Sequence, residues 1–154
     1  MKYLSIFLLS MMFSACSSKT TEVPAHLKHV DQVLWIVDDL DNVIAHWDEL
    51  GFSQVMYLDT VEASLEEANE RIHLKLALAN LGGAQITWIQ PIKHHSLFSD
   101  FLDSYGNGAM SLVHRFESPE QLQAELDRLS GLGVDILEKI TIITGQGDLH
   151  YTLM

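Results

Sequence analysis

The feature that most constrains this fold is an order of strand, helix and strands that occurs twice along the 154 residues. In the first half, residues 33–37 suit a buried strand, and residues 38–52 place apolar side chains at helical spacing. The acidic stretch 59–70 is expected to be either a loop or a short exposed helix. Further strands are predicted at 53–58, 71–81 and 84–90.

The second half repeats this order. Residues 110–116 predict a strand. Ser118, Pro119 and Gln121 then form a capping box, with proline at the first helical position, and predict the start of a helix over 118–133. Three more strands are predicted at 134–140, 141–145 and 148–154.

The spacing of equivalent positions is nearly constant between the halves. Gly133 lies 82 positions after Gly51, and Leu112 lies 80 positions after Gln32. A chain of this length is expected to form one domain. Two tandem βαβββ units therefore predict an α+β fold in which a curled mixed sheet encloses a cleft. The predicted units span 28–92 and 108–154.

The N-terminus predicts export. Residues 1–15 have the plan of a secretory signal peptide, and their apolar run is too short to span a bilayer. Cys16, the only cysteine, follows Phe-Ser-Ala and resembles the cysteine of a bacterial lipobox, which implies cleavage before it and lipidation. An ordinary cleaved signal that leaves a free thiol is the alternative. Residues 16–27 then form the lipidated cysteine and a polar tether.

Charge and localisation limit the partners. The net charge of −12, from 21 acidic and 9 basic residues, argues against nucleic acid. By resemblance to sorted lipoproteins, Ser17 after the cysteine favours the outer membrane, facing the periplasm, so that the lipid anchor makes the membrane a partner.

The chain resembles a known superfamily. The stretches "VDQVLWIVDDLDNVIAHWDELGF" (30–52) and "LGGAQITWIQPIKHHSLFSDFLDSYGNGAMSLV" (81–113) are similar to the vicinal oxygen chelate (VOC) superfamily, which includes glyoxalases, methylmalonyl-CoA epimerases, extradiol dioxygenases and bleomycin-resistance proteins. The resemblance covers about residues 28–154, and the second stretch looks most like an epimerase. It implies four inward residues that hold a divalent metal and stabilise an enolate.

The metal positions of the superfamily fall on Gln32, Thr87, Leu112 and Tyr151. Only glutamine is a residue that the superfamily uses there. Because the other three offer neither carboxylate nor imidazole, we expect no metal cofactor. Gln32 is then expected to be a hydrogen-bonding group in a metal-free cleft, together with Thr87 and Tyr151. The alternative is that Gln32 only bonds a neighbouring backbone group.

His114 is the histidine with a candidate role. It stands two residues after Leu112, so strand alternation predicts that both point into the cleft. There it could act as a general base or bind a ligand, or it could be a neutral core histidine bonded to a backbone carbonyl. His94 and His95 are expected at the surface of a turn.

Three functions follow from these observations. The first is an envelope lipoprotein with a metal-free module that binds a small molecule through Gln32, Thr87, Leu112, His114 and Tyr151. The second is an isomerase or lyase, like the epimerases or glyoxalases, that acts on a small carbonyl compound. The third is a structural or assembly role at the envelope. Superfamily members also pair, which makes a homodimer an option.

Overall fold

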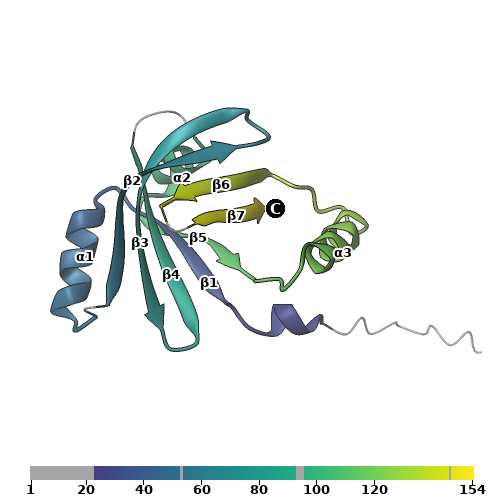
Figure 1. Cartoon of the computed structure of the whole chain (residues 1–154), viewed down its shortest axis with the longest axis horizontal. Helices are drawn as coiled ribbons and strands as arrows, with labels where there is room; N and C mark the ends of the chain where they lie inside the picture. The colour runs from purple at the N-terminus through teal and green to yellow at the C-terminus, as the bar shows by residue number, and fades with distance from the viewer. Residues whose placement is uncertain (1–22, 53, 93–95, 146) are drawn as a thin grey trace, which may run out of the picture.

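A single curled sheet organises the molecule (Figure 1). The computed structural model describes residues 23–52, 54–92, 96–145 and 147–154. The sheet has seven strands in the order β5-β1-β4-β3-β2-β6-β7. These are β1 (Gln32–Ile36), β2 (Val55–Leu65), β3 (Glu70–Leu81), β4 (Ala84–Ile92), β5 (Gly108–Val113), β6 (Glu138–Thr144) and β7 (Gly147–Leu153). The helices are the short 3-10 turn η1 (Ala25–Lys28) and α1 (Leu40–Glu49), α2 (Leu97–Tyr105) and α3 (Pro119–Ser130).

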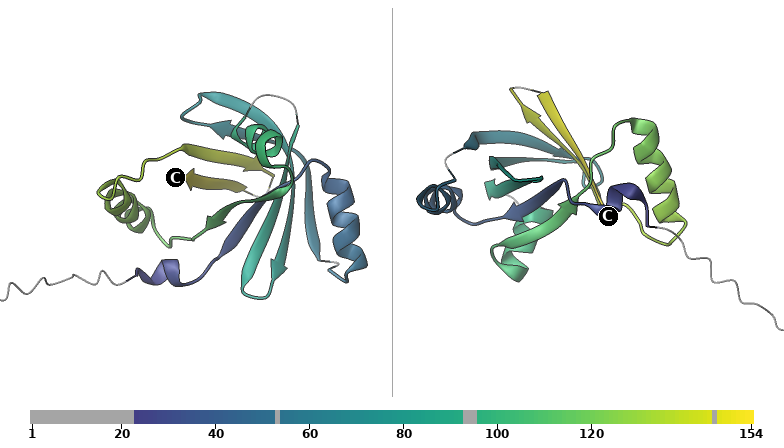
Figure 2. Two further views of the ribbon diagram at one scale, coloured as in Figure 1. Left: turned by 180° about the vertical axis from the view of Figure 1, so that it is seen from behind. Right: turned by 90° about the horizontal axis from the view of Figure 1, so that it is seen from below.

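The two halves of the chain meet at two places in the sheet. β1 pairs antiparallel with β5, and β2 pairs antiparallel with β6. Within the first half, β1 lies parallel to β4, and β4, β3 and β2 follow one another in antiparallel order. The sheet curls, as the views in Figure 2 show. The expected α+β fold with a curled mixed sheet is confirmed.

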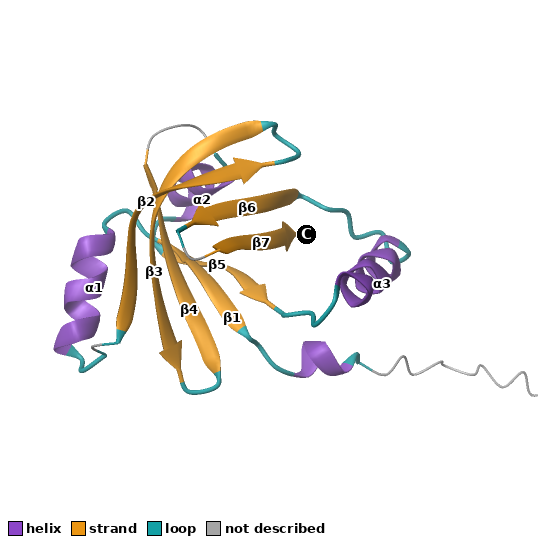
Figure 3. Cartoon of the chain, viewed as in Figure 1, coloured by secondary structure: helices purple, strands orange, loops and turns teal. Residues whose placement is uncertain are grey.

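The curl gives the sheet two different apolar faces. On the concave face, side chains from all parts of the sheet pack together, among them Leu34, Leu76 and Ile142, and Phe98 of α2 joins them. On the convex face, α1 covers β3 and β4 (Figure 3), and the rings of Trp47 and Trp88 lie 5.0 Å apart. The main core therefore lies inside the curl.

The one helix cap predicted from the sequence, at Ser118, is present in the structure. Ser118 Oγ accepts a hydrogen bond from the backbone N–H of Gln121, and Pro119 opens α3, which confirms the predicted start of this helix. Helix α2 was not predicted. It begins with a capping box between Ser96 and Ser99, a weaker signal because serine stands where glutamate or glutamine is usual.

Most of the acidic stretch 59–70 is strand. Strand β2 continues to Leu65, and only residues 66–69 form a turn. Val61, Ala63 and Leu65 point into the concave core at every second position, and the polar side chains lie between them. For residues 59–65 the expected loop or helix is wrong because this alternation, rather than the acidic composition, decides the conformation.

The second half has fewer strands than expected. The stretches predicted as strands at 134–140 and 141–145 form one strand, β6, which begins at Glu138. The buried carboxylate of Glu138 accepts hydrogen bonds from the backbone N–H groups of Glu67 (2.7 Å) and Ala68 (3.2 Å), so β6 starts beside the β2–β3 turn. In the described residues the second unit is therefore βαββ, whereas the first is βαβββ as predicted.

Some predictions lie outside the described residues. They are the signal peptide 1–15, Cys16, the first part of the tether and the pair His94 and His95. The described end of the tether contains η1 rather than an irregular segment. Among the residues that the structure covers, no helix is long and apolar enough to cross a membrane.

Candidate ligand-binding site

Gln32 is the centre of a buried polar trio on the concave side. It begins β1, and only 3% of it is exposed. Its Nε2 donates hydrogen bonds to Thr87 Oγ1 of β4 (2.6 Å) and to the Tyr151 hydroxyl of β7 (3.0 Å). The structure thus brings together three of the five predicted site residues. The amide bonds these two side chains and not merely a neighbouring backbone group.

Tyr151 completes the trio from the far end of the sheet. Its ring packs against the concave core next to the ladder between β6 and β7. Burial raises the pKa of the Tyr151 phenol, and the Gln32 amide and the charge of Arg115 oppose this rise only in part. The phenol is therefore neutral at physiological pH and serves as a hydrogen-bonding group.

The residues at the four inward positions do not fit the metal that the superfamily implies. Gln32 presents an amide that donates hydrogen bonds to the neutral hydroxyls of Thr87 and Tyr151. The β5 residue opposite Gln32 is Val113. Divalent metals in proteins are held by carboxylate, imidazole or thiolate groups, and this set contains none of them.

The predicted inward direction of Leu112 is wrong. In the pairing of β1 with β5, Gln32 lies opposite Val113, and Val33 lies opposite Leu112. Opposite residues of an antiparallel pair share a face, so Val113 points inward with Gln32, and Leu112 points outward with 61% of it exposed. His114 lies beyond the end of β5, where the alternation of the strand no longer sets its direction.

His114 lies in a separate cluster near the N-terminal segment. Its ring centroid is 6.3 Å from that of His26, and its buried Nδ1 has no hydrogen-bond partner in the part of the chain that the structure describes. His26 Nε2 is 3.2 Å from Oε1 of Glu125 on α3. Hydrogen bonds from Arg128, aided by His26, lower the pKa of Glu125 to about 2. This cluster attaches the segment before β1 to α3.

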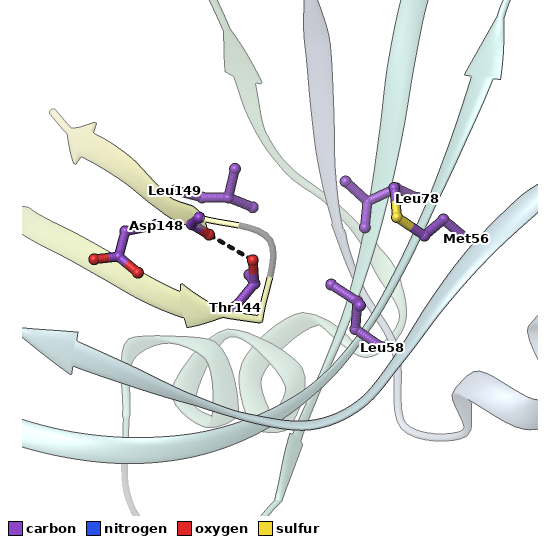
Figure 4. Close-up of a pocket in the computed structure, with 7 residues that line it drawn as sticks. Met56, Leu58, Leu78, Thr144, Asp148 and Leu149 are labelled. Atoms are coloured by element: carbon purple, nitrogen blue, oxygen red, sulfur yellow. Dashed lines mark hydrogen bonds between the residues drawn. The ribbon is translucent and has the colours of Figure 1, made fainter.

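An apolar recess lies between the strands β2 and β3 and the ends of β6 and β7 (Figure 4). It has a volume of about 270 Å³. Four apolar side chains line it: Met56 and Leu58 from β2, Leu78 from β3 and Leu149 from β7. Its remaining wall is formed by Thr144 at the end of β6 and by Gly147 and Asp148 at the start of β7, and the Asp148 carboxylate points away from the recess (Figure 4).

The sheet register connects the recess to the trio. Leu78 lies opposite Thr87 in the pairing of β3 with β4, so the two share the concave face. Leu149 is two residues before Tyr151 in β7 and points to the same face. The recess and the trio therefore lie on the same concave face of the sheet.

The recess residues were missed from the sequence. The alternation of β3 would identify Leu78 as an inward residue, because it stands two after the core residue Leu76. That Leu78 meets Leu149 is not encoded in either strand, because their contact depends on the curl of the whole sheet.

Comparisons with known proteins support the fold. No protein-family model matches the chain. A search of curated proteins found no match either. A crystal structure of a hypothetical protein from Bacillus halodurans is similar, with a TM-score of 0.53 at 14% identity, over 82% of this chain and 94% of that one. The crystal structure of methylmalonyl-CoA epimerase from Mycobacterium tuberculosis is similar with a TM-score of 0.50 at 23% identity, over 80% of this chain and 86% of that one. At these identities the similarity shows a VOC-like fold and no activity.

Proposed function

We propose that this chain is an envelope lipoprotein whose domain binds a small apolar molecule without a metal ion. The observation that carries the binding proposal is an apolar recess on the same concave face as the Gln32 trio. Ligand sites are mostly apolar and contain a few polar groups that orient the ligand. The recess, at about 270 Å³, is slightly below the usual lower limit of roughly 300 Å³, so the expected ligand is small.

The envelope location rests on the N-terminal sequence. A signal peptide over residues 1–15 would export the chain, and acylation of Cys16 would anchor it in the outer membrane, facing the periplasm. In the native host, Cys16→Ser is expected to release the protein from membranes or leave it uncleaved, and mass spectrometry of the wild type should find acyl chains on Cys16. An unmodified N-terminus beyond residue 16 would disprove the anchor.

The isomerase or lyase alternative lacks support at the site. Forming and stabilising an enolate requires a base near the substrate proton, together with a metal or hydrogen-bond donors near the reacting oxygen. The inward set of Gln32, Thr87, Val113 and Tyr151 supplies neither a carboxylate nor an imidazole. Binding without chemistry is the function that this set supports best.

One tryptophan substitution at the recess, with a matched control, tests the binding proposal. Met56 is 46% exposed at the recess, so Met56→Trp should fill it without disturbing the core. Ile143→Trp is the matched control, because Ile143 is 45% exposed and follows the inward Ile142. A panel of small apolar compounds is screened by the shift in melting temperature of the wild type.

We expect some compounds to raise the melting temperatures of the wild type and of Ile143→Trp by several degrees. The same compounds should leave the melting temperature of Met56→Trp unchanged. Equal shifts in both variants would place the ligand elsewhere. If no compound shifts the wild type, the structural or assembly role becomes the better hypothesis.

A further inference from the structure

The Tyr151 hydroxyl has a donor hydrogen with no acceptor among the described residues. Its oxygen accepts a hydrogen bond from Gln32 Nε2 (3.0 Å), so its own hydrogen must point to another acceptor. In the part of the chain that the structure describes, this hydroxyl makes no second hydrogen bond. A buried donor without an acceptor is unfavourable, so the spare hydrogen indicates a partner from outside the chain.

This surplus of donor hydrogens belongs to the whole polar trio. Gln32, Thr87 and Tyr151 carry more donor hydrogens than their two mutual hydrogen bonds use. Turning the amide round would move the spare hydrogens to Gln32 and would not remove them. Thr87 is wholly buried and Gln32 nearly so, whereas Tyr151 is partly exposed. Tyr151 is therefore the member of the trio that a ligand can reach.

Two members of the trio each have a neighbour that lines the apolar recess. Leu149 stands two residues before Tyr151 on the same face of β7, about 7 Å along the strand. Leu78 lies directly opposite Thr87, where Cβ atoms are about 5 Å apart. Leu78 and Leu149 face each other across the recess (Figure 4). A molecule seated between them has to extend by about one such spacing to meet the trio.

The surroundings of Tyr151 favour an uncharged acceptor. Burial raises the pKa of its phenol, so the group is a neutral donor at physiological pH. The positive charge that acts on Tyr151 is that of Arg115, which is exposed and donates a hydrogen bond to Gln85 Oε1 (2.8 Å). A buried anion without a paired cation is unfavourable, and the chain has a net charge of −12.

A carbonyl oxygen meets these conditions best. It accepts a hydrogen bond and brings no donor of its own, whereas the O–H of an alcohol needs a further acceptor beside apolar side chains. We propose that the ligand is a small apolar molecule with one uncharged carbonyl group, such as a ketone, an aldehyde or an ester, and that the Tyr151 hydroxyl donates a hydrogen bond to its oxygen. Gln32 positions the phenol by donating to its oxygen. This ligand class rests on the binding function proposed above and refines it.

A pair of compounds with nearly the same shape tests the proposal on the full chain. Acetophenone has a carbonyl oxygen where α-methylstyrene has a CH2 group. The dissociation constants of both compounds are measured by NMR titration of the wild type, Tyr151→Phe and Tyr105→Phe. Tyr105→Phe is the matched control, because Tyr105 is 78% exposed and does not line the recess.

Tyr151→Phe should weaken the binding of acetophenone by roughly five- to tenfold, the effect of one lost hydrogen bond. Its affinity for α-methylstyrene should change by less than about twofold, because this compound has no oxygen to accept the bond. Tyr105→Phe should change neither affinity. A merely structural role of the Tyr151 hydroxyl would instead weaken both compounds alike.

Infrared spectroscopy of the bound ketone gives a second measurement that does not need the variant. The carbonyl stretch of acetophenone bound to the wild type should lie at lower frequency than in an apolar solvent, so it tests the hydrogen bond even if Tyr151→Phe does not fold. Four results would overturn the proposal: no binding of acetophenone, an unshifted carbonyl stretch, equal effects of Tyr151→Phe on both compounds, or tighter binding of benzoate than of acetophenone. Binding of α-methylstyrene that Met56→Trp abolishes would keep the recess as a ligand site in each of these cases, so the two proposals fail separately.

Discussion

The hydrogen bonds of Gln32 make a prediction about coupling between buried residues. Thr87→Val removes the hydroxyl group 2.6 Å from the Gln32 amide and keeps the shape of a side chain that is wholly buried. We expect it to lower the free energy of unfolding by about 1 kcal/mol, the usual net value of one hydrogen bond. Gln32→Leu leaves the hydroxyls of both Thr87 and Tyr151 without the amide and should cost about 1–3 kcal/mol.

The double variant distinguishes a bonded pair from two independent effects. The double variant Gln32→Leu/Thr87→Val removes both polar groups of the pair, so that neither is left buried without a hydrogen-bond partner. The loss should therefore be about 1 kcal/mol smaller than the sum of the two single losses.

Urea unfolding of the four proteins measures this coupling. A loss of 1 kcal/mol should shift the midpoint by about 0.5 M, given a slope of roughly 2 kcal/mol per M. Gln54→Leu, at an exposed position, is the control and should change stability by less than about 0.5 kcal/mol. If the single losses add without coupling, Gln32 and Thr87 do not depend on one another as described.

Two further predictions concern α3 and the concave core. Arg128 and His26 lower the pKa of Glu125 to about 2 from an ordinary 4.5. The stabilising contribution of the Glu125 carboxylate is therefore full above pH 4.5 and is lost as the pH falls toward 2. Glu125→Gln should make the free energy of unfolding less dependent on pH in that window, and an unchanged pH profile would contradict the pairing with Arg128. Ile142→Ala should cost about 2–5 kcal/mol in urea unfolding, and Ile143→Ala, which truncates a half-exposed neighbour, far less; similar losses would refute the assignment of faces in β6.

The comparison of sequence with structure shows where local patterns were sufficient. The capping box at Ser118 predicted the start of α3, and the repeat predicted the first βαβββ unit. The positions implied by the VOC resemblance placed Gln32, Thr87 and Tyr151 on one surface, and their hydrogen bonds agree. The first two features depend on residues within one element or on a pattern that repeats along the chain, whereas the trio joins three distant strands and was expected only from the resemblance.

The direction of the side chains in β5 could not be decided in the same way. Met110 and Leu112 are apolar in one phase and Val113 is apolar in the other, so composition leaves both phases open. The pairing with β1, which includes a bulge, selects the phase in which Val113 points inward. In this phase Leu112 points outward.

The sequence by itself determined the order of helices and strands in the first half and the helix of the second half, because hydrophobic period and capping act over a few residues. The polar groups at the inward positions were implied by the VOC resemblance. The tertiary structure decided which residues line the recess and which face each residue of β5 presents. Leu78 and Leu149 meet only because seven strands curl together, and Val113 faces inward only because β5 pairs with β1 in one register. Such contacts join distant parts of the chain, and strand pairing, which no short stretch specifies, sets them.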